Sequence, residues 1–179
     1  MPSDKFYPTP LPRLLEIILK QMDRNQAIFG IPKALFFEPQ TTDAFRSKRY
    51  GQLLETPLGV AAGPHTQLSQ NIVAAWLTGA RFIELKTVQT LDELEVSKPC
   101  IDMQDEGYNC EWSQELKIRQ SFEQYLDAWI MIHVLKDHLG IGSNKERGFI
   151  FNMSVGYDMA GILNENVQWF LKKTQDASA

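Results

Sequence analysis

The stretch Thr56-Pro57-Leu58-Gly59-Val60-Ala61-Ala62-Gly63-Pro64-His65-Thr66-Gln67 decides the fold that this sequence predicts. Residues 58–62 read as a short buried strand, which ends in Ala61, Ala62 and Gly63, where a core usually places larger side chains. Small residues at a strand end let another group approach the backbone closely. That group could be a tightly packed helix or a ligand, and the stretch alone is compatible with both.

Strands and helices alternate along the chain after this stretch. We expect further strands over 81–88 and 149–155, a helix ending at Gly79, a long helix capped by Ser113, and a final helix. The long helix would bury Phe122, Tyr125, Leu126, Trp129, Ile130 and His133, and the final helix Met159, Leu163, Val167, Phe170 and Leu171. Such alternation is typical of the α/β class, in which crossover helices join parallel strands.

The first 55 residues follow another pattern. Thr9 and Pro10 predict a helix start, with Thr9 as cap and Pro10 as first residue, and an amphipathic helix follows. Residues 25–55 show no clean period and predict an irregular segment with a short hairpin near 50–54. The sequence thus divides into an N-terminal extension, 1–55, and a unit of alternating strands and helices, 56–179.

The alternating unit contains the pattern of three strands. An open doubly wound sheet of this size is possible, whereas a TIM (β/α)8 barrel needs eight strands and about 250 residues. If the fold is a barrel, we expect the chain to hold its first three βα units, a truncated barrel that would not be an active enzyme by itself.

Composition excludes several classes of protein. The net charge of −4 and the pI near 5.4 argue against a nucleic-acid partner. No apolar run approaches the ~20 residues of a membrane helix, and the N-terminus does not resemble a secretory signal, so we expect a cytoplasmic protein. Cys100 and Cys110 have no metal-ligand spacing, which fits reduced thiols and predicts no metal site.

Candidate site residues follow the strands, because ligands of parallel α/β sheets bind at the carboxyl ends. Lys86 and Thr87 end the second strand, and Asn152 lies near the end of the third. A lysine in an apolar strand needs a counter-charge, which could be Glu84, or a ligand oxygen. Asn109 could bind a ligand or serve as a turn residue. Gly63 belongs to no phosphate-loop motif, so the sequence does not predict a phosphate site there.

The order of these motifs resembles the dihydroorotate dehydrogenase family and the flavin barrel of dihydropyrimidine dehydrogenase. The resemblance rests on Thr-Pro-Leu-Gly-Val-Ala-Ala-Gly at 56–63, Phe-Ile-Glu-Leu-Lys-Thr-Val at 82–88, Lys-Pro-Cys-Ile at 98–101 and Tyr-Asn at 108–109. Four further segments are more similar to the N-terminal part of the flavoprotein subunit assigned to selenate reductase: 27–32, 62–67, 76–79 and 109–113.

The resemblance implies an FMN-dependent oxidoreductase barrel and a role for each candidate residue. The backbone of Ala61, Ala62 and Gly63 would form the floor beneath the flavin, and Lys86 would stabilise the anionic reduced flavin. Thr87 and Asn152 would contact the cofactor. Asn109 would hydrogen-bond a small planar heterocyclic substrate.

The chain also departs from these families. Dihydroorotate dehydrogenases continue after the substrate asparagine with a small glycine-containing loop, where this chain has Cys110-Glu111-Trp112-Ser113, so orotate does not fit well. The larger relatives carry iron–sulfur clusters, FAD and NADPH, and we expect such redox modules, and the remaining barrel strands, elsewhere in the same or a partner chain. Two alternatives remain: a non-catalytic barrel fragment that docks on a partner, and a barrel aldolase with a Schiff base on Lys86.

Overall fold

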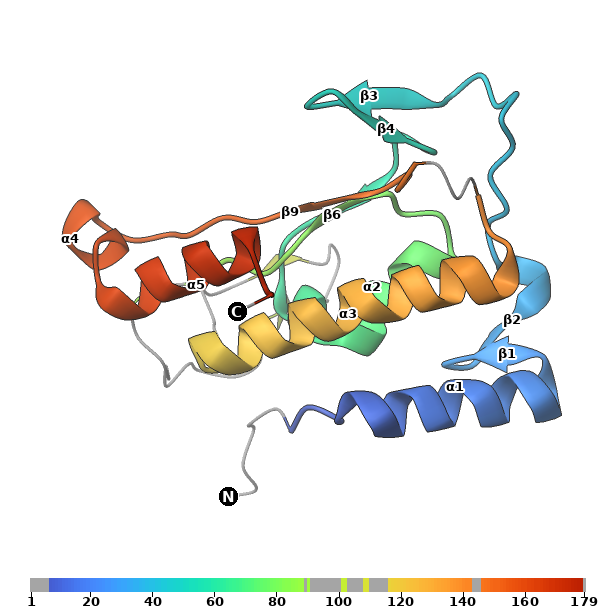
Figure 1. The fold of residues 1–179 in the computed structure, drawn as a ribbon, viewed down its shortest axis with the longest axis horizontal. Coiled ribbons are helices and arrows are strands. Elements are labelled where there is room, and N and C mark those ends of the chain that lie inside the picture. Colours follow the sequence, from blue (N-terminus) through green and yellow to red (C-terminus); the bar gives the residue numbers. More distant parts are fainter. Residues whose placement is uncertain are drawn as a thin grey trace.

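The computed structural model describes residues 7–88, 90, 116–142 and 146–178, together with the backbone of 101–102 and 108–109. Figure 1 shows the arrangement of its helices and strands. In chain order they are α1 (Leu11–Asn25), β1 (Ala27–Ile28), β2 (Ile31–Pro32), the 3-10 helix η1 (Lys33–Leu35), β3 (Ser47–Arg49), β4 (Gln52–Leu54), β5 (Gly59–Val60), the 3-10 helix η2 (Pro64–Gln67), α2 (Ser69–Leu77), β6 (Phe82–Glu84), β7 (Ile101–Asp102), β8 (Tyr108–Asn109), α3 (Ile118–Leu139), β9 (Ile150–Asn152), α4 (Met159–Ile162) and α5 (Glu165–Gln175).

A parallel sheet of strand order β5-β6-β9 forms the centre of the molecule, which confirms the α/β class. The strands are shorter than the predicted 58–62, 81–88 and 149–155. Pairing between β6 and β9 nevertheless continues at intervals, through the Leu85 N–H that donates to the Asn152 carbonyl and through a parallel bridge from Val88 to Val155. The predicted strand positions are therefore correct, but their regular hydrogen bonding ends early.

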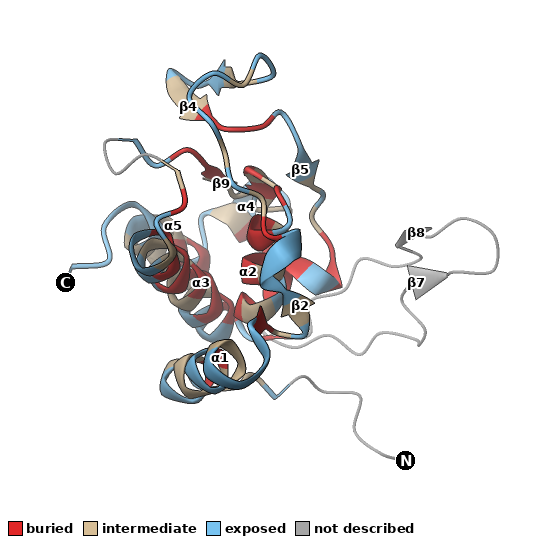
Figure 2. Cartoon of the chain, turned by 90° about the vertical axis from the view of Figure 1, so that its right-hand side faces the viewer, coloured by how far each residue is buried: buried red, intermediate tan, exposed pale blue. Residues whose placement is uncertain are grey.

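The two faces of this sheet have different neighbours. In Figure 1 the helices α2 and α3 lie against one face, with α1 beyond them, and the β3–β4 hairpin lies on the opposite side. Figure 2 shows that the buried residues concentrate between the sheet and these helices. Leu14 and Ile18 of α1 belong to the same core cluster as Trp76, Ile83 and Phe149. The N-terminal segment thus contributes to the core that supports the sheet.

Two tight hairpins shape the segment that was predicted to be irregular. In the β1–β2 hairpin Phe29 and Gly30 have φ angles of 49° and 80°, and in the β3–β4 hairpin Tyr50 and Gly51 have φ angles of 50° and 72°. Positive φ at both loop residues is the geometry of two-residue hairpins, and glycine accepts it without strain. The predicted hairpin near 50–54 is confirmed, whereas the first hairpin was missed.

Both long helices begin elsewhere than predicted. Pro10, not Thr9, occupies the N-cap position of α1, so the predicted cap is one residue too early. The predicted cap of α3, Ser113, lies outside the described residues. The helix begins at Ile118, where the Gln120 side chain accepts a hydrogen bond from the Lys117 N–H at 3.0 Å and satisfies one N–H at the helix start.

The buried stripe of α3 also differs from the predicted one. It contains Ile118, Ser121, Tyr125, Ala128, Ile132 and Leu135 at helical spacing, whereas Trp129 and Phe122 are only half-buried and Ile130 is exposed. The prediction followed the large aromatic side chains. These lie on the flank of the stripe, where Trp129 contacts Phe149 and Phe151 of the third-strand segment.

The final helix is interrupted. Asn164 has extended backbone angles and is the N-cap residue of α5, so α4 and α5 are separate helices. Because of this break, Met159 and Leu163 are exposed, whereas Val167 and Phe170 of α5 are buried as predicted. The prediction of one continuous apolar face was therefore wrong for the α4 half.

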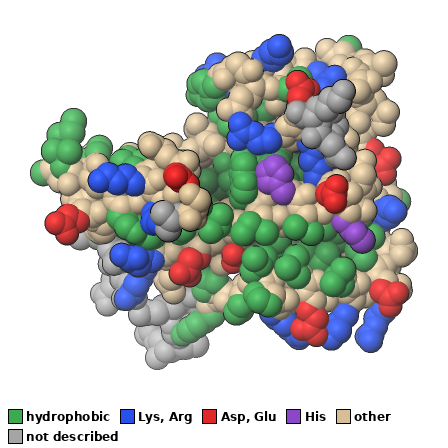
Figure 3. All heavy atoms as spheres, in the orientation of Figure 1, with side chains coloured by type: hydrophobic (Ala, Val, Ile, Leu, Met, Phe, Trp, Pro, Cys, Tyr) green, Lys and Arg blue, Asp and Glu red, His purple; other side chains and the backbone are tan. Residues whose placement is uncertain are grey.

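Hydrophobic side chains also reach the surface, and Figure 3 shows them gathered over α3. Ile130 and Val134 are the large exposed hydrophobic residues of this helix. No helix in the described part of the chain has both the length and the apolar composition that crossing a membrane would require.

Candidate functional site at the carboxyl ends of the parallel strands

The small-residue strand end after β5 leads into a tightly hydrogen-bonded turn. Ala61 is exposed and Ala62 half-buried, whereas Gly63 is buried. The Thr66 hydroxyl accepts from the Gly63 N–H at 3.2 Å and donates to its carbonyl at 3.1 Å. These bonds hold the backbone at the point where it leaves the sheet.

Gly63 is covered by a side chain of its own turn. A Cβ atom on Gly63 would lie 2.6 Å from Cε1 and 2.8 Å from Nδ1 of His65, which is closer than such atoms can approach. A side chain at Gly63 would therefore displace the His65 imidazole, and the nearest described atoms beyond the adjacent residues belong to this ring rather than to a packed helix. His65 itself is exposed, so its ring lies at the surface beside the strand end.

Lys86 is a buried lysine at the carboxyl end of the sheet, shortly after β6. It is 5% exposed, and its backbone carbonyl accepts a hydrogen bond from the Tyr125 hydroxyl at 2.7 Å. Tyr125 comes from the middle of α3 and is itself buried, and burial raises the pKa of its hydroxyl. The phenol therefore stays protonated and donates to the backbone of Lys86.

Two hydroxyl groups meet beside Lys86. The side-chain oxygens of Thr87 and Ser154 lie 3.0 Å apart, joining the segment after β6 to the segment after β9. The segments that follow β5, β6 and β9 thus contain small residues, the buried lysine Lys86 and two hydroxyl groups. This set suits a polar ligand that carries or develops negative charge.

Asn152 lies on the hairpin side of the sheet. In the parallel register it is directly opposite Glu84, and its amide nitrogen donates to Oε1 of that residue at 3.3 Å. Both residues line a cavity of about 350 Å³ between the sheet and the β3–β4 hairpin, together with Arg49, Tyr50 and Phe82. The structure therefore brings Asn152 into a polar pair.

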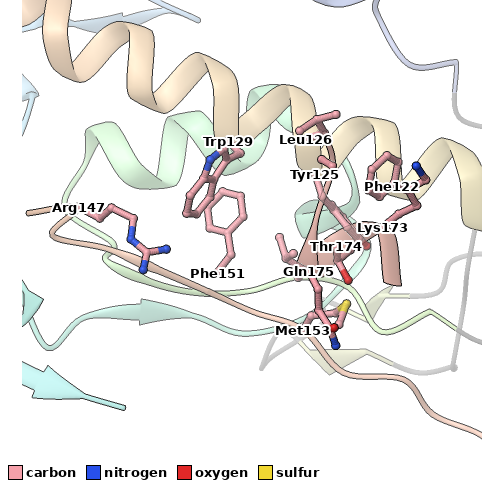
Figure 4. Close-up of a pocket in the computed structure, with 12 residues that line it drawn as sticks. Phe122, Tyr125, Leu126, Trp129, Arg147, Phe151, Met153, Lys173, Thr174 and Gln175 are labelled. Carbon is pink, nitrogen blue, oxygen red and sulfur yellow. The ribbon is translucent and has the colours of Figure 1, made fainter. Parts of the chain in front are cut away.

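A larger cavity of about 530 Å³ lies on the other face of the sheet, among α3, the third-strand segment and the end of α5. Figure 4 shows the side chains of Tyr125, Trp129 and Phe151 around it, with Arg147 at one side and Lys173 nearer the other. It is mainly aromatic and apolar. None of the predicted site residues whose side chains the structure describes lines it, so we do not assign the site to this cavity.

The opposite, amino-terminal ends of the strands hold a buried ion pair. The Arg81 side chain donates to the Glu55 carboxylate at 2.6 Å and to the Trp76 carbonyl at 2.6 Å. Lys136, nearby, donates to the carbonyls of Glu146 and Arg147. Charged groups at this end of α/β sheets stabilise the fold rather than bind ligands.

Residues 29–179 match the family described as "Oxidoreductase YgfK, N-terminal TIM-barrel domain". The chain belongs to this family. The YgfK assignment is consistent with the parallel α/β sheet and agrees with the predicted barrel and oxidoreductase class. It does not by itself identify a flavin, a dihydroorotate-type substrate or selenate.

Two curated relatives carry the same family name. The "Putative oxidoreductase YgfK" of Escherichia coli K12 and that of Escherichia coli O157:H7 are each 47% identical to this chain over 179 residues. The match covers 98% of this chain and 17% of each relative, so the chain spans about a sixth of their length. No solved structure matches the chain significantly.

The predicted substrate residue of this YgfK-family chain can be placed only by its backbone. Asn109 belongs to β8, which pairs antiparallel with β7, so that Asn109 is opposite Ile101. The sequence predicted an acidic loop here and missed this strand pair. The side chain of Asn109, Cys110 and most of the acidic segment lie outside the described residues.

The sequence did not reveal three contacts that shape this region. They are the hydrogen bond from Tyr125 to the Lys86 carbonyl, the contact of Ser154 with Thr87, and the position of His65 over Gly63. Tyr125 read as an ordinary core aromatic, because nothing in a helical period shows that its hydroxyl reaches a strand carbonyl. Ser154 directly precedes the parallel bridge at Val155, and its position could have been inferred from the register of the predicted strands.

The Tyr125 hydroxyl gives a test of how Lys86 is held. We expect Tyr125→Phe to lower the free energy of unfolding by about 1–2 kcal/mol, because the buried Lys86 carbonyl loses its donor. Urea unfolding followed by circular dichroism measures this loss. Tyr157→Phe, at an exposed tyrosine, is the matched control, and an equal effect of both changes would contradict the assignment.

Proposed function

We propose that this chain forms the first strands of an FMN-binding TIM barrel of the dihydroorotate dehydrogenase type, within a larger oxidoreductase. The observation that carries the proposal is Lys86, a buried ammonium-bearing residue at the carboxyl end of the central strand segment. Membership of a family of oxidoreductase barrel domains supports the reaction class.

The residues present fit a flavin by their chemistry. A flavin is flat, offers carbonyl oxygens and ring nitrogens along its pyrimidine edge, and becomes more negative there on reduction. Ala61 is exposed and Ala62 is half-buried, and their small side chains leave the backbone accessible to a flat ring. Lys86 and the Thr87 hydroxyl supply donors for such an edge, and the Asn152 amide can both donate and accept there.

When bound, the flavin supplies the capacity to take up or give a hydride. In this proposal the Lys86 ammonium group holds positive charge where negative charge develops, which favours the reduced state. Ala61, Ala62 and Gly63 provide the floor, Thr87 and Asn152 position the cofactor, and Asn109 orients a small planar heterocyclic substrate. Iron–sulfur clusters, FAD and NADPH would belong to other parts of the complete protein or to partner chains.

The test is the cofactor content of the complete protein that contains this segment. We expect a yellow protein that releases FMN on acid denaturation, identified by its mass and visible spectrum. A colourless protein that also binds no added FMN would refute the proposal. Trapping of a substrate on Lys86 by borohydride would instead support the Schiff-base alternative.

Gly63 gives a second test of the same site. We expect Gly63→Val in the complete protein to abolish stoichiometric FMN content, because a branched side chain would fill the floor and displace His65. The measurement is the ratio of flavin to protein absorbance after gel filtration.

His65→Ala is the control that separates the two effects of Gly63→Val. It removes the imidazole and leaves the floor open, so flavin content should stay close to that of the unmodified protein. Full flavin content in the Gly63→Val protein would show that the floor lies elsewhere.

A further inference from the structure

Glu84 is a carboxylate on the hairpin side of the sheet to which the proposed reaction assigns no task. It is half-buried and directly opposite Asn152 in the register of β6 and β9. Its Oε1 accepts a hydrogen bond from the Asn152 amide nitrogen at 3.3 Å. The backbone N–H of the next residue, Leu85, donates to the Asn152 carbonyl at 2.9 Å, so both ends of the pair are held by the sheet.

The orientation of the Asn152 amide follows from this contact. An asparagine side chain has one accepting oxygen and two donating hydrogens, and these can exchange places by rotation of the amide. A carboxylate only accepts, so it binds the nitrogen and repels the oxygen. With one hydrogen taken by Glu84, the amide keeps its oxygen and one hydrogen for another partner. Within the described part of the chain, that oxygen makes no hydrogen bond.

We propose that Glu84 is a positioning residue: its carboxylate holds the Asn152 amide so that Oδ1 accepts the ring N–H of the bound flavin. This inference rests on the proposed flavin site. The oxidised isoalloxazine has a single ring N–H, at N3, so a held acceptor selects this edge of the ring. If the amide rotated, a donor would meet that N–H and the hydrogen bond would be lost.

The surroundings of Glu84 support a role through Asn152. The pair lines the cavity of about 350 Å³ beneath the β3–β4 hairpin, where Arg49, Lys48 and Tyr50 form the facing wall. The Arg49 guanidinium carbon lies 4.9 Å from the centre of the Tyr50 ring. Within the described part of the chain, the Glu84 carboxylate accepts from the amide across the sheet and forms no salt bridge with a cation of the hairpin.

The experiment compares FMN with FMN methylated at N3, using the complete protein freed of its flavin. In the unmodified protein we expect the methylated flavin to bind about tenfold more weakly, as for the loss of one hydrogen bond in a water-excluded site. In Glu84→Gln this ratio should fall to about fivefold, because a glutamine can pair with either orientation of the Asn152 amide and about half of the population then presents Oδ1. Glu165→Gln, at an exposed glutamate of α5, should keep the tenfold ratio.

Asn152→Ala provides an independent measurement if Glu84→Gln does not fold. It should bring the ratio close to one, and adding Glu84→Gln to it should change nothing further, since the two residues act through one contact. An unchanged ratio in Glu84→Gln or in Asn152→Ala would overturn the inference while leaving the flavin site intact. A complete protein that binds neither flavin would overturn the proposed function and this inference together.

Discussion

Replacing Arg81 by methionine is expected to lower the free energy of unfolding by about 3–5 kcal/mol, the largest stability effect that we predict. Arg81 is fully buried and its partner Glu55 is 4% exposed. Burial lowers the pKa of Arg81, while the hydrogen bond to Glu55 opposes this shift and keeps the guanidinium charged. Methionine fills similar space but leaves the buried Glu55 carboxylate without its hydrogen-bonded counter-charge, so that the more distant Lys136 compensates it only in part.

The backbone around Glu55 explains why this carboxylate cannot move away. Cβ atoms on Gly142 and Gly148 would lie 2.2 Å and 2.4 Å from its Oε1, so both glycines enclose it. The Glu55 N–H also donates to the Gly148 carbonyl at 3.0 Å. An unpaired Glu55 would therefore disrupt the entry to the third strand.

Urea unfolding followed by tryptophan fluorescence measures this effect, because Trp76 is buried and its ring lies 5.0 Å from the Arg81 guanidinium carbon. Arg13→Met, which breaks an exposed pair with Glu16, is the control and should leave the unfolding midpoint unchanged. The double change of Glu55→Gln and Arg81→Met should cost less than the sum of the single changes. A small effect of Arg81→Met would show that the pair is not a main support of the sheet.

Replacing Lys86 by alanine is expected to give the largest functional effect. The proposed charge-assisted contact of Lys86 with the reduced flavin corresponds to about 1.5–3 kcal/mol. For a two-electron couple this lowers the flavin reduction potential by about 30–60 mV. The sign follows from charge, because a cation stabilises the anionic reduced flavin and its loss makes reduction harder.

The measurement is the midpoint potential of the flavin in the complete protein, taken beside the turnover rate. Lys172→Ala, at an exposed lysine of α5, controls for the loss of one positive charge and should leave the potential unchanged. The melting temperature shows whether Lys86→Ala disturbs the fold. A potential equal to that of the unmodified protein would assign Lys86 to a structural role.

Local pattern sufficed for the class of fold and for the approximate position of each central strand. The apolar runs near 59, 83 and 151 are separated by segments with a helical period. A helix between two strands serves as the crossover connection that joins parallel strands, so this pattern predicts a parallel sheet. The hairpin at Tyr50-Gly51 was predictable from its glycine. The hairpin at Phe29-Gly30 was missed because a phenylalanine at positive φ is uncommon and the strands around it are two residues each.

By itself, the sequence determined the fold class of alternating strands and helices, the small residues at the strand end from Ala61 to Gly63, and Lys86 as a candidate site residue. Each depends on residue type and spacing along one strand, which the chain carries locally. Only the tertiary structure decided that His65 covers Gly63, that Tyr125 holds the backbone of Lys86, and that Glu84 binds Asn152. The last two contacts join residues 39 and 68 positions apart, and their geometry arises from the packing of α3 and the register of β6 with β9.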